Sequence, residues 1–210
     1  MVFLPGCNFA CPYCHNPGLV APLDDSILVD WDDALAHLRA RRGLLSGVVF
    51  SGGEPTLRRE LPALVALARE LGYLVKLDSN GSDPGALAAA GADFLAMDLK
   101  TAPARYRALW PSAPADMEAR ILGSMRVLRS SGAGYEFRIT CAPGIFGPAE
   151  ARELAAFLEP GDPVVLQRYR PGEVLDPAWA AGVSPYTEPE LETLRDLLAA
   201  RAPMTRIRSG

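Results

Sequence analysis

The chain has 210 residues, of which 49% are apolar and 22% are charged, and this composition predicts one soluble globular domain with a substantial core. A formal charge of −4 argues against a nucleic-acid-binding protein, and no apolar run approaches the ~18 residues that a membrane span needs. The sequence shows no charged and apolar leader, so its four cysteines predict a reducing compartment, the cytoplasm, and no disulfide framework.

Short apolar runs alternate with amphipathic segments along the chain, which is typical of βα units with buried parallel strands. Asp30 is expected to cap the first helix, and Thr187 with Glu190 forms a capping box for the last one. The expected helices lie within residues 31–43, 61–71, 86–90, 117–128, 149–158 and 187–198. The expected strands span residues 1–4, 48–50, 74–77, 94–99, 135–141 and 164–169, and residues 204–207 are a candidate for a seventh.

This order of elements predicts an α/β fold, a partial (β/α)6 barrel of parallel strands, with a doubly wound sheet as the alternative. No linker or repeat divides the chain, so residues 1–210 are expected to form one domain. Met1 falls inside the first expected strand, and we therefore expect that strand to be truncated and the chain to be less stable than a complete homologue. The polar motifs follow strand ends, where β/α barrels carry their chemistry.

The segment from Gly6 to Pro17 holds three cysteines, Cys7, Cys11 and Cys14, in the spacing C-x3-C-x2-C. Three thiolates are one short of the set that a structural zinc ion or an ordinary ferredoxin cluster requires. On a cubic 4Fe–4S cluster they leave one iron open for chemistry. The alternative is a zinc site with His15 as fourth ligand. Cys141 lies far away in an apolar run and is expected to be a small buried hydrophobe.

Three further motifs follow expected strands. Gly52 and Gly53, in Ser51-Gly-Gly-Glu-Pro55, lack side chains and allow a close backbone approach. Asp78 and Asp98 end two apolar strands, in Asp78-Ser-Asn-Gly81 and Asp98-Leu-Lys100, and both face one rim of the sheet. The simplest interpretation of the two acids is capping of nearby backbone amides, and a shared binding site is the alternative that we favour.

Together these motifs resemble the radical S-adenosylmethionine (SAM) superfamily. The flanking residues, among them Tyr13-Cys-His-Asn-Pro17 and Met97-Asp-Leu-Lys100, narrow the resemblance to the activating enzymes of glycyl-radical enzymes, and within these to the anaerobic ribonucleoside-triphosphate reductase activating proteins. The resemblance implies a radical SAM oxidoreductase with one 4Fe–4S cluster on Cys7, Cys11 and Cys14. The open iron would chelate the amino and carboxylate groups of SAM.

The resemblance also implies roles for the other motif residues. Tyr13 would pack near the adenine, Glu54 or its neighbouring carbonyls would accept from the amino group, and Lys100 would balance the carboxylate. A monovalent cation is implied beside that carboxylate, at Asp78, Ser79 and Asp98. The strand-end Asn80 and Arg138 on the fifth strand are further candidates for the cofactor site.

The implied reaction is reductive cleavage of SAM to a 5′-deoxyadenosyl radical. This radical would take a hydrogen atom from a backbone glycine of a partner enzyme, and the partner that the resemblance implies is anaerobic ribonucleotide reductase. A flavodoxin or ferredoxin would supply the electron. The chain departs from the better-known members at the sixth strand, where Tyr169-Arg170 stands in place of a histidine, so Gln167, Arg168 and Arg170 receive no role. Two alternatives remain: a radical SAM enzyme for a small molecule or another peptide, and a non-catalytic metal module.

Overall fold

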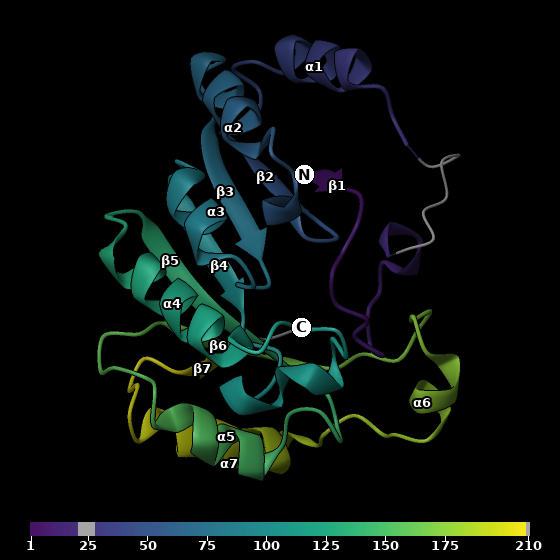
Figure 1. Ribbon diagram of the computed structural model, residues 1–210, viewed down its shortest axis with the longest axis vertical. Helices are drawn as coiled ribbons and strands as arrows, with labels where there is room; N and C mark the ends of the chain where they lie inside the picture. Colours follow the sequence, from purple (N-terminus) through teal and green to yellow (C-terminus); the bar gives the residue numbers. More distant parts are fainter. Residues whose placement is uncertain (21–27, 209–210) are drawn as a thin grey trace.

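A computed structural model of the chain describes residues 1–20 and 28–208. Seven parallel strands form one sheet in sequential order from β1 to β7 (Figure 1). This order confirms the partial barrel, because a doubly wound sheet would reverse its strand order part-way. The seventh strand is present, although shorter than expected. The strands are β1 (Val2–Leu4), β2 (Gly47–Gly52), β3 (Leu74–Ser79), β4 (Phe94–Asp98), β5 (Gly134–Cys141), β6 (Val164–Arg168) and β7 (Arg206–Ile207).

Most helices cover the outer face of the sheet, whereas the short helix over residues 177–181 lies apart from them, on the side of the loop after β1 (Figure 1). The expected caps are present: the Asp30 side chain accepts from the amide of Asp32 at 2.8 Å, and Glu190 accepts from the amide of Thr187 at 2.8 Å. The sequence did not predict the short helix α6. The α-helices are α1 (Trp31–Ala40), α2 (Leu61–Glu70), α3 (Pro84–Ala89), α4 (Met117–Ser130), α5 (Pro148–Ala155), α6 (Pro177–Ala181) and α7 (Glu188–Ala199).

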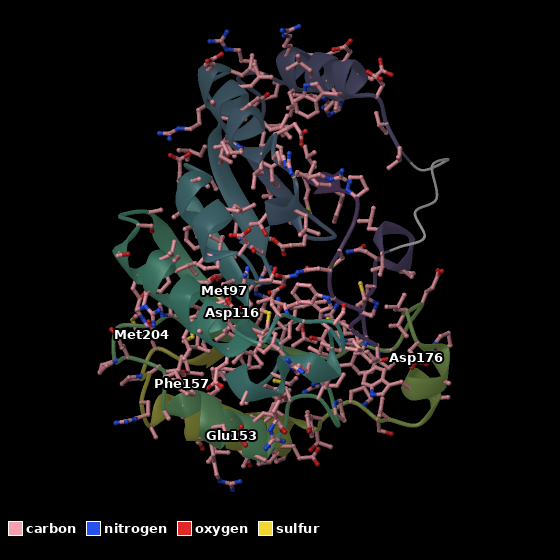
Figure 2. The ribbon with its side chains drawn as sticks, in the orientation of Figure 1. Met97, Asp116, Glu153, Phe157, Asp176 and Met204 are labelled. Carbon is pink, nitrogen blue, oxygen red and sulfur yellow. The ribbon has the colours of Figure 1, made fainter. Side chains whose placement is uncertain are left out.

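Short 3₁₀ turns complete the loops at the site-bearing end of the sheet. They are η1 (Pro17–Leu19), η3 (Pro55–Leu57) and η4 (Pro103–Ala108). Met97 on β4 lies in the middle of the molecule and is fully buried (Figure 2). Within the described ranges, no helix is long and apolar enough to cross a membrane.

The two faces of the sheet differ because side chains alternate along each strand. On β5, Phe137 and Ile139 point outward and are fully buried against the helices. Arg138 lies between them, on the inner face, beside Asp98 of β4 in the strand register. The concave inner face therefore carries charged side chains next to the C-terminal strand ends.

Candidate active site

The three cysteines of the loop after β1 line one cavity of about 220 Å³ at the C-terminal ends of the strands. Cys11 is buried, and Cys7 and Cys14 are half-buried. The described residues contain no group of three or more His, Cys, Asp or Glu side chains that could hold a single metal ion, and the ring of His15 contacts the carbonyl of Glu173 at 3.2 Å. The three thiols thus share one cavity, as the protein ligands of a three-cysteine cluster must.

Backbone contacts to the glycines after β2 hold the cysteine loop in place. The amide of Gly53 donates to the carbonyl of Leu4 at 2.9 Å, and the amide of Glu54 donates to that of Gly6 at 2.7 Å. A Cβ atom on Gly53 would lie 2.0 Å from the Gly6 carbonyl oxygen, and Gly52 has φ +117°. The sequence predicted a close backbone approach at this motif, and the structure identifies the approaching partner as the cysteine loop itself.

Side-chain contacts also hold the cysteine loop against the segment after β3 and against η4. The amide of Asn8 donates to the hydroxyl of Ser82 at 2.8 Å, and the Asn8 oxygen accepts from Asn80 at 2.8 Å. The ring of Phe9 packs edge-on against Tyr106 of η4, with 5.6 Å between centroids. The loop residues between Cys7 and Cys11 are therefore held in place by the protein, which pre-organises these thiols before any cluster binds.

The segment before α6 closes the far side of the loop. The amide of Leu175 donates to the carbonyl of Cys14, and the amide of Asp176 donates to that of Pro12, both at 3.0 Å. Figure 2 shows Asp176 at the edge of the molecule on this side. This contact could not be predicted from the sequence, because it joins segments about 160 residues apart and the loop that makes it has no periodic pattern.

Glu54 is buried, and its carboxylate ties β2 to the end of β3. One carboxylate oxygen accepts from the Thr56 amide at 3.1 Å, the Thr56 hydroxyl at 2.5 Å and the Ser79 hydroxyl at 2.7 Å. The other accepts from the Asn80 amide at 2.6 Å. Burial raises the pKa of Glu54, although these donors oppose the shift. The Glu54 carboxylate thus holds the end of β3 against the end of β2, and it also lines the cavity.

Asp78 and Asp98 belong to a continuous network of ion pairs on the inner face. The Arg138 guanidinium bridges them, at 2.9 Å from Asp78 and 2.8 Å from Asp98. The other oxygen of Asp78 lies 2.8 Å from Nζ of Lys76, and that of Asp98 lies 2.9 Å from Nζ of Lys100. Each carboxylate oxygen thus lies near a cationic nitrogen, but Oδ1 of Asp78 is buried and receives no hydrogen bond from the described residues, so this oxygen is still available to a further ligand.

The pKa values follow from burial and from this network. Burial raises the pKa of Cys7, and raises that of Cys11 to about 11, while the nearby Lys100 opposes both shifts. Burial also works against the charges of Lys100 and Asp98, but their mutual attraction dominates: the pKa of Lys100 lies well above its usual value and that of Asp98 well below. A positive charge is therefore held at the cavity wall over the working pH range.

An aromatic group lies behind the cysteine loop. Tyr13 is buried and packs against Trp179 of α6 at 6.2 Å, and Trp179 packs edge-on against Tyr169 at 5.0 Å. Among the described residues, the hydroxyl oxygens of Tyr13 and Tyr169 are buried without a hydrogen-bond partner. Two unpaired hydroxyl groups beside cavities are costly unless a ligand supplies the missing partner.

Most of the sequence-predicted site residues come together in this cavity. Arg138 is the exception, because its side chain turns along the inner face toward the aspartates and does not line the space. Cys141 points to the outer face and is fully buried, which confirms the expected buried hydrophobe, and burial raises its pKa to about 12. The predicted residues that line the cavity are Cys7, Cys11, Tyr13, Cys14, Gly52, Gly53, Glu54, Asp78, Ser79, Asn80, Asp98 and Lys100.

The cavity also has lining residues that were not predicted from the sequence: Phe9, Asn16, Val20, Ser51 and Thr140. Phe9 stands between two cysteines of the motif, so its position was a usable signal. Ser51 directly precedes the glycine pair, but a lone serine carries little information. Thr140 lies two residues after Arg138 on β5, and the alternation of side chains along the strand places it on the same inner face.

A family model matches the part of the chain that carries most of this cavity. The model described as the radical SAM superfamily matches residues 1–157. The chain belongs to the radical SAM superfamily. It is accordingly a radical SAM enzyme, and the family implies a 4Fe–4S cluster and SAM as its cofactors. The three thiols fit the cluster, since they are soft ligands that line one shared cavity.

Two groups of curated relatives are similar to the chain. MJ1227 of Methanocaldococcus jannaschii, whose name assigns it provisionally to the glycyl-radical enzyme activating enzymes, is 26% identical over 84% of this chain and 75% of its own length. The PqqA peptide cyclase of Xanthomonas oryzae pv. oryzae is 44% identical over 75 residues, which are 36% of this chain and 20% of the cyclase. The chain thus spans most of the first relative but only a fifth of the second.

Solved structures share the fold at low identity. SuiB of Streptococcus suis bound to S-adenosylmethionine matches 97% of this chain and 48% of SuiB, with a TM-score of 0.65 and 15% identity. The radical SAM enzyme HemN of Escherichia coli matches 94% of this chain and 50% of HemN, with a TM-score of 0.59 and 16% identity. The chain spans about half the length of these proteins, so the likeness concerns the barrel.

Proposed function

We propose that this enzyme generates a glycyl radical on a partner enzyme, and that the partner is anaerobic ribonucleoside-triphosphate reductase. The observation that carries the proposal is the similarity to MJ1227, which extends over 84% of this chain. The chain's motifs after β3 and β4 support it, because both acids and Lys100 lie at the same cavity as the three cysteines. A flavodoxin or ferredoxin is the proposed electron donor.

In this proposal Cys7, Cys11 and Cys14 hold the cluster. When bound, the cluster supplies the electron that splits SAM into methionine and a 5′-deoxyadenosyl radical, which takes a hydrogen atom from the glycine. Lys100 provides a fixed positive charge for the SAM carboxylate, because Asp98 holds it in the cavity wall at 2.9 Å. Tyr13 offers a buried ring and a free hydroxyl for the adenosine.

The remaining cavity residues position and shield the cofactors. Gly52 and Gly53 bring their backbone against the cysteine loop, and the carbonyls beside Glu54 are the proposed acceptors for the SAM amino group. The hydrogen bonds from Ser79 and Asn80 to the Glu54 carboxylate hold the end of β3 in place, and SAM would lie against this end. A monovalent cation beside the SAM carboxylate, at Asp78, Ser79 and Asp98, is also part of this proposal, and Oδ1 of Asp78, which receives no hydrogen bond from the described residues, is an oxygen available to it.

Anaerobic reconstitution with the candidate reductase tests the proposal. We expect about four irons per chain, deoxyadenosine after reduction, and a glycyl-radical signal in electron paramagnetic resonance (EPR) spectra. The signal should disappear when the target glycine of the reductase is replaced by alanine, whereas SAM cleavage should persist. Deoxyadenosine without any protein radical on the reductase would contradict the proposal.

A second candidate function is modification of another peptide. The segment of 44% identity to a PqqA peptide cyclase favours it, as does the fold shared with SuiB, which was also solved bound to its precursor peptide SuiA. The two candidates differ in their product. A peptide modifier leaves a closed-shell peptide of altered mass, detectable by mass spectrometry, whereas an activating enzyme leaves a persistent radical on an otherwise unchanged glycine.

A further inference from the structure

A second and larger cavity, of about 610 Å³, adjoins the cofactor cavity. The two cavities share His15 and Thr140 as lining residues, so they lie next to each other at these side chains. Its walls come from the ends of β5, β6 and β7 and from the beginning of α7. A space of this size suits a drug-sized ligand or a short piece of polypeptide.

Positive charge dominates the walls of this cavity. Arg168, Arg170 and Arg208 line it, and Glu188 is the one acid among its lining residues in the described ranges. Glu188 pairs with Arg168, and Arg208 lies 3.4 Å from Glu136 on the inner face. Arg170 is exposed and has no ion-pair partner among residues 1–20 and 28–208. The cavity thus carries guanidinium groups whose charge the protein does not fully neutralise.

An unpaired hydroxyl group also belongs to this wall. Tyr169 is 1% exposed, and its hydroxyl has no hydrogen-bond partner among the described residues. His15 stacks on the Tyr169 ring with 6.3 Å between centroids, and Trp179 packs on its edge, so the ring is fixed in place. A buried hydroxyl costs free energy when it stays unpaired, and a ligand in the cavity it lines would supply the partner.

We propose that this second cavity binds a carboxylate-bearing segment of the polypeptide substrate, next to the residue that reacts. The inference rests on the proposed function insofar as the occupant is a polypeptide. Guanidinium groups bind carboxylates through paired, charge-assisted hydrogen bonds, and the Tyr169 hydroxyl adds a neutral donor. Acidic side chains or a chain-terminal carboxylate would be held here while the neighbouring backbone enters the cofactor cavity past His15 and Thr140.

Binding of synthetic peptides to the reconstituted, SAM-loaded enzyme tests this inference. The probe is a fluorescent heptapeptide with a central glycine flanked by glutamates, and the matched probe replaces each glutamate with glutamine. We expect the glutamine peptide to bind about tenfold or more weakly, and the preference to shrink at high salt. Equal affinities for the two peptides would overturn the inference.

Two variants locate the binding. Arg170→Glu is expected to weaken binding of the glutamate peptide at least about tenfold, because it reverses an exposed charge on the wall. Tyr169→Phe removes only the unpaired hydroxyl and is expected to weaken binding about threefold or more without lowering thermal stability. Arg195→Glu is the charge-matched control, because Arg195 lies on α7 and pairs with Asp196 but does not line the cavity, and this variant is expected to bind normally.

Two parallel measurements separate the possible failures. SAM affinity is measured on the same variants, and a loss that equals the peptide loss would assign the cavity to the cofactor and overturn the inference. Inorganic phosphate is included as a competitor, and binding of phosphate with no preference between the two peptides would also overturn it. Charge-dependent peptide binding with no glycyl radical on any reductase would support this site while contradicting the proposed function.

Discussion

The two faces of the same sheet are built from different chemistry. On the outer face, Phe137, Ile139 and Leu166 are fully buried against the helices. On the inner face, the neighbouring position on β5 is Arg138, which bridges Asp78 and Asp98. Side chains thus alternate between polar and apolar from Glu136 to Cys141 on β5, and the strand register places Arg138 beside Asp98 of β4.

The difference indicates which face stabilises the protein and which is kept for chemistry. Apolar burial is the main source of folding free energy, at roughly 25 cal/mol per Å². Buried ion pairs contribute little net stability, because the loss of hydration offsets their attraction. The charges at the end of the inner face therefore have a functional explanation, and strongly shifted pKa values at a cavity are consistent with it. Substitutions on the two faces should have separable effects.

The largest effect on stability is expected on the outer face. Phe137→Ala removes a fully buried aromatic ring and should lower the free energy of unfolding by about 3–5 kcal/mol, as measured by urea denaturation. The fraction that stays folded should bind SAM with nearly normal affinity. A stability loss below about 1 kcal/mol, or a specific loss of SAM affinity, would contradict the conclusion that the outer face serves stability and the inner face serves chemistry.

A smaller loss of stability, with a larger loss of function, is expected on the inner face. Arg138→Met leaves Asp78 and Asp98 without their shared partner, which should cost roughly 3 kcal/mol. The freed carboxylates would then repel the SAM carboxylate, so cleavage of SAM should fall by more than stability explains. A loss of SAM cleavage no larger than the loss of folded protein would show that Arg138 has only a structural role.

Gly53→Ala tests the backbone contact between Gly53, just after β2, and Gly6 in the cysteine loop. The new Cβ atom would meet the Gly6 carbonyl at 2.0 Å, which forces the loop to shift and should cost roughly 2 kcal/mol. Because the cysteines lie on the displaced loop, iron content after reconstitution should fall as well. Gly172→Ala is the matched control, since its Cβ would come no closer than 3.8 Å to another residue. Full iron content in Gly53→Ala would show that the contact is not needed.

The smallest expected effect is on how the stability of the protein falls at acid pH. Lys100 and Arg138 hold the pKa of Asp98 below its usual value, so the folded chain binds fewer protons at this group than the unfolded chain. This contribution to stability is complete above the unfolded pKa of about 4 and is lost as pH falls toward the folded value. Asp98→Asn should therefore flatten the decline of stability between pH 5 and pH 3. An unchanged slope would contradict the pairing.

The sequence predicted the sheet and most of the cavity for physical reasons that are easy to state. Apolar runs give buried strands, and motifs at the carboxyl ends of parallel strands meet at one edge, so Asp78, Asp98 and the cysteines were expected together. The direction of Arg138 was not predictable, because a long side chain on the inner face can turn to the cavity or along the sheet. Only the partners on neighbouring strands decide between these directions.

Contacts between distant segments were also missed. The glycine pair was correctly expected to allow a close approach, but the approaching backbone, at Leu4 and Gly6, became visible only in the structure. Helix α6 has five residues, too few for an apolar period to emerge, so Trp179 was not expected behind Tyr13. The second cavity joins β6, β7 and α7, and no single motif in the sequence marks it.

The most direct test of the central claim is EPR spectroscopy of the reconstituted, reduced protein with and without SAM. The account predicts a 4Fe–4S signal that changes when SAM is added, because one iron is left open by the three thiols, and loss of both signal and SAM cleavage in Cys11→Ala. A signal that ignores SAM, or stoichiometric zinc in place of iron, would contradict the account.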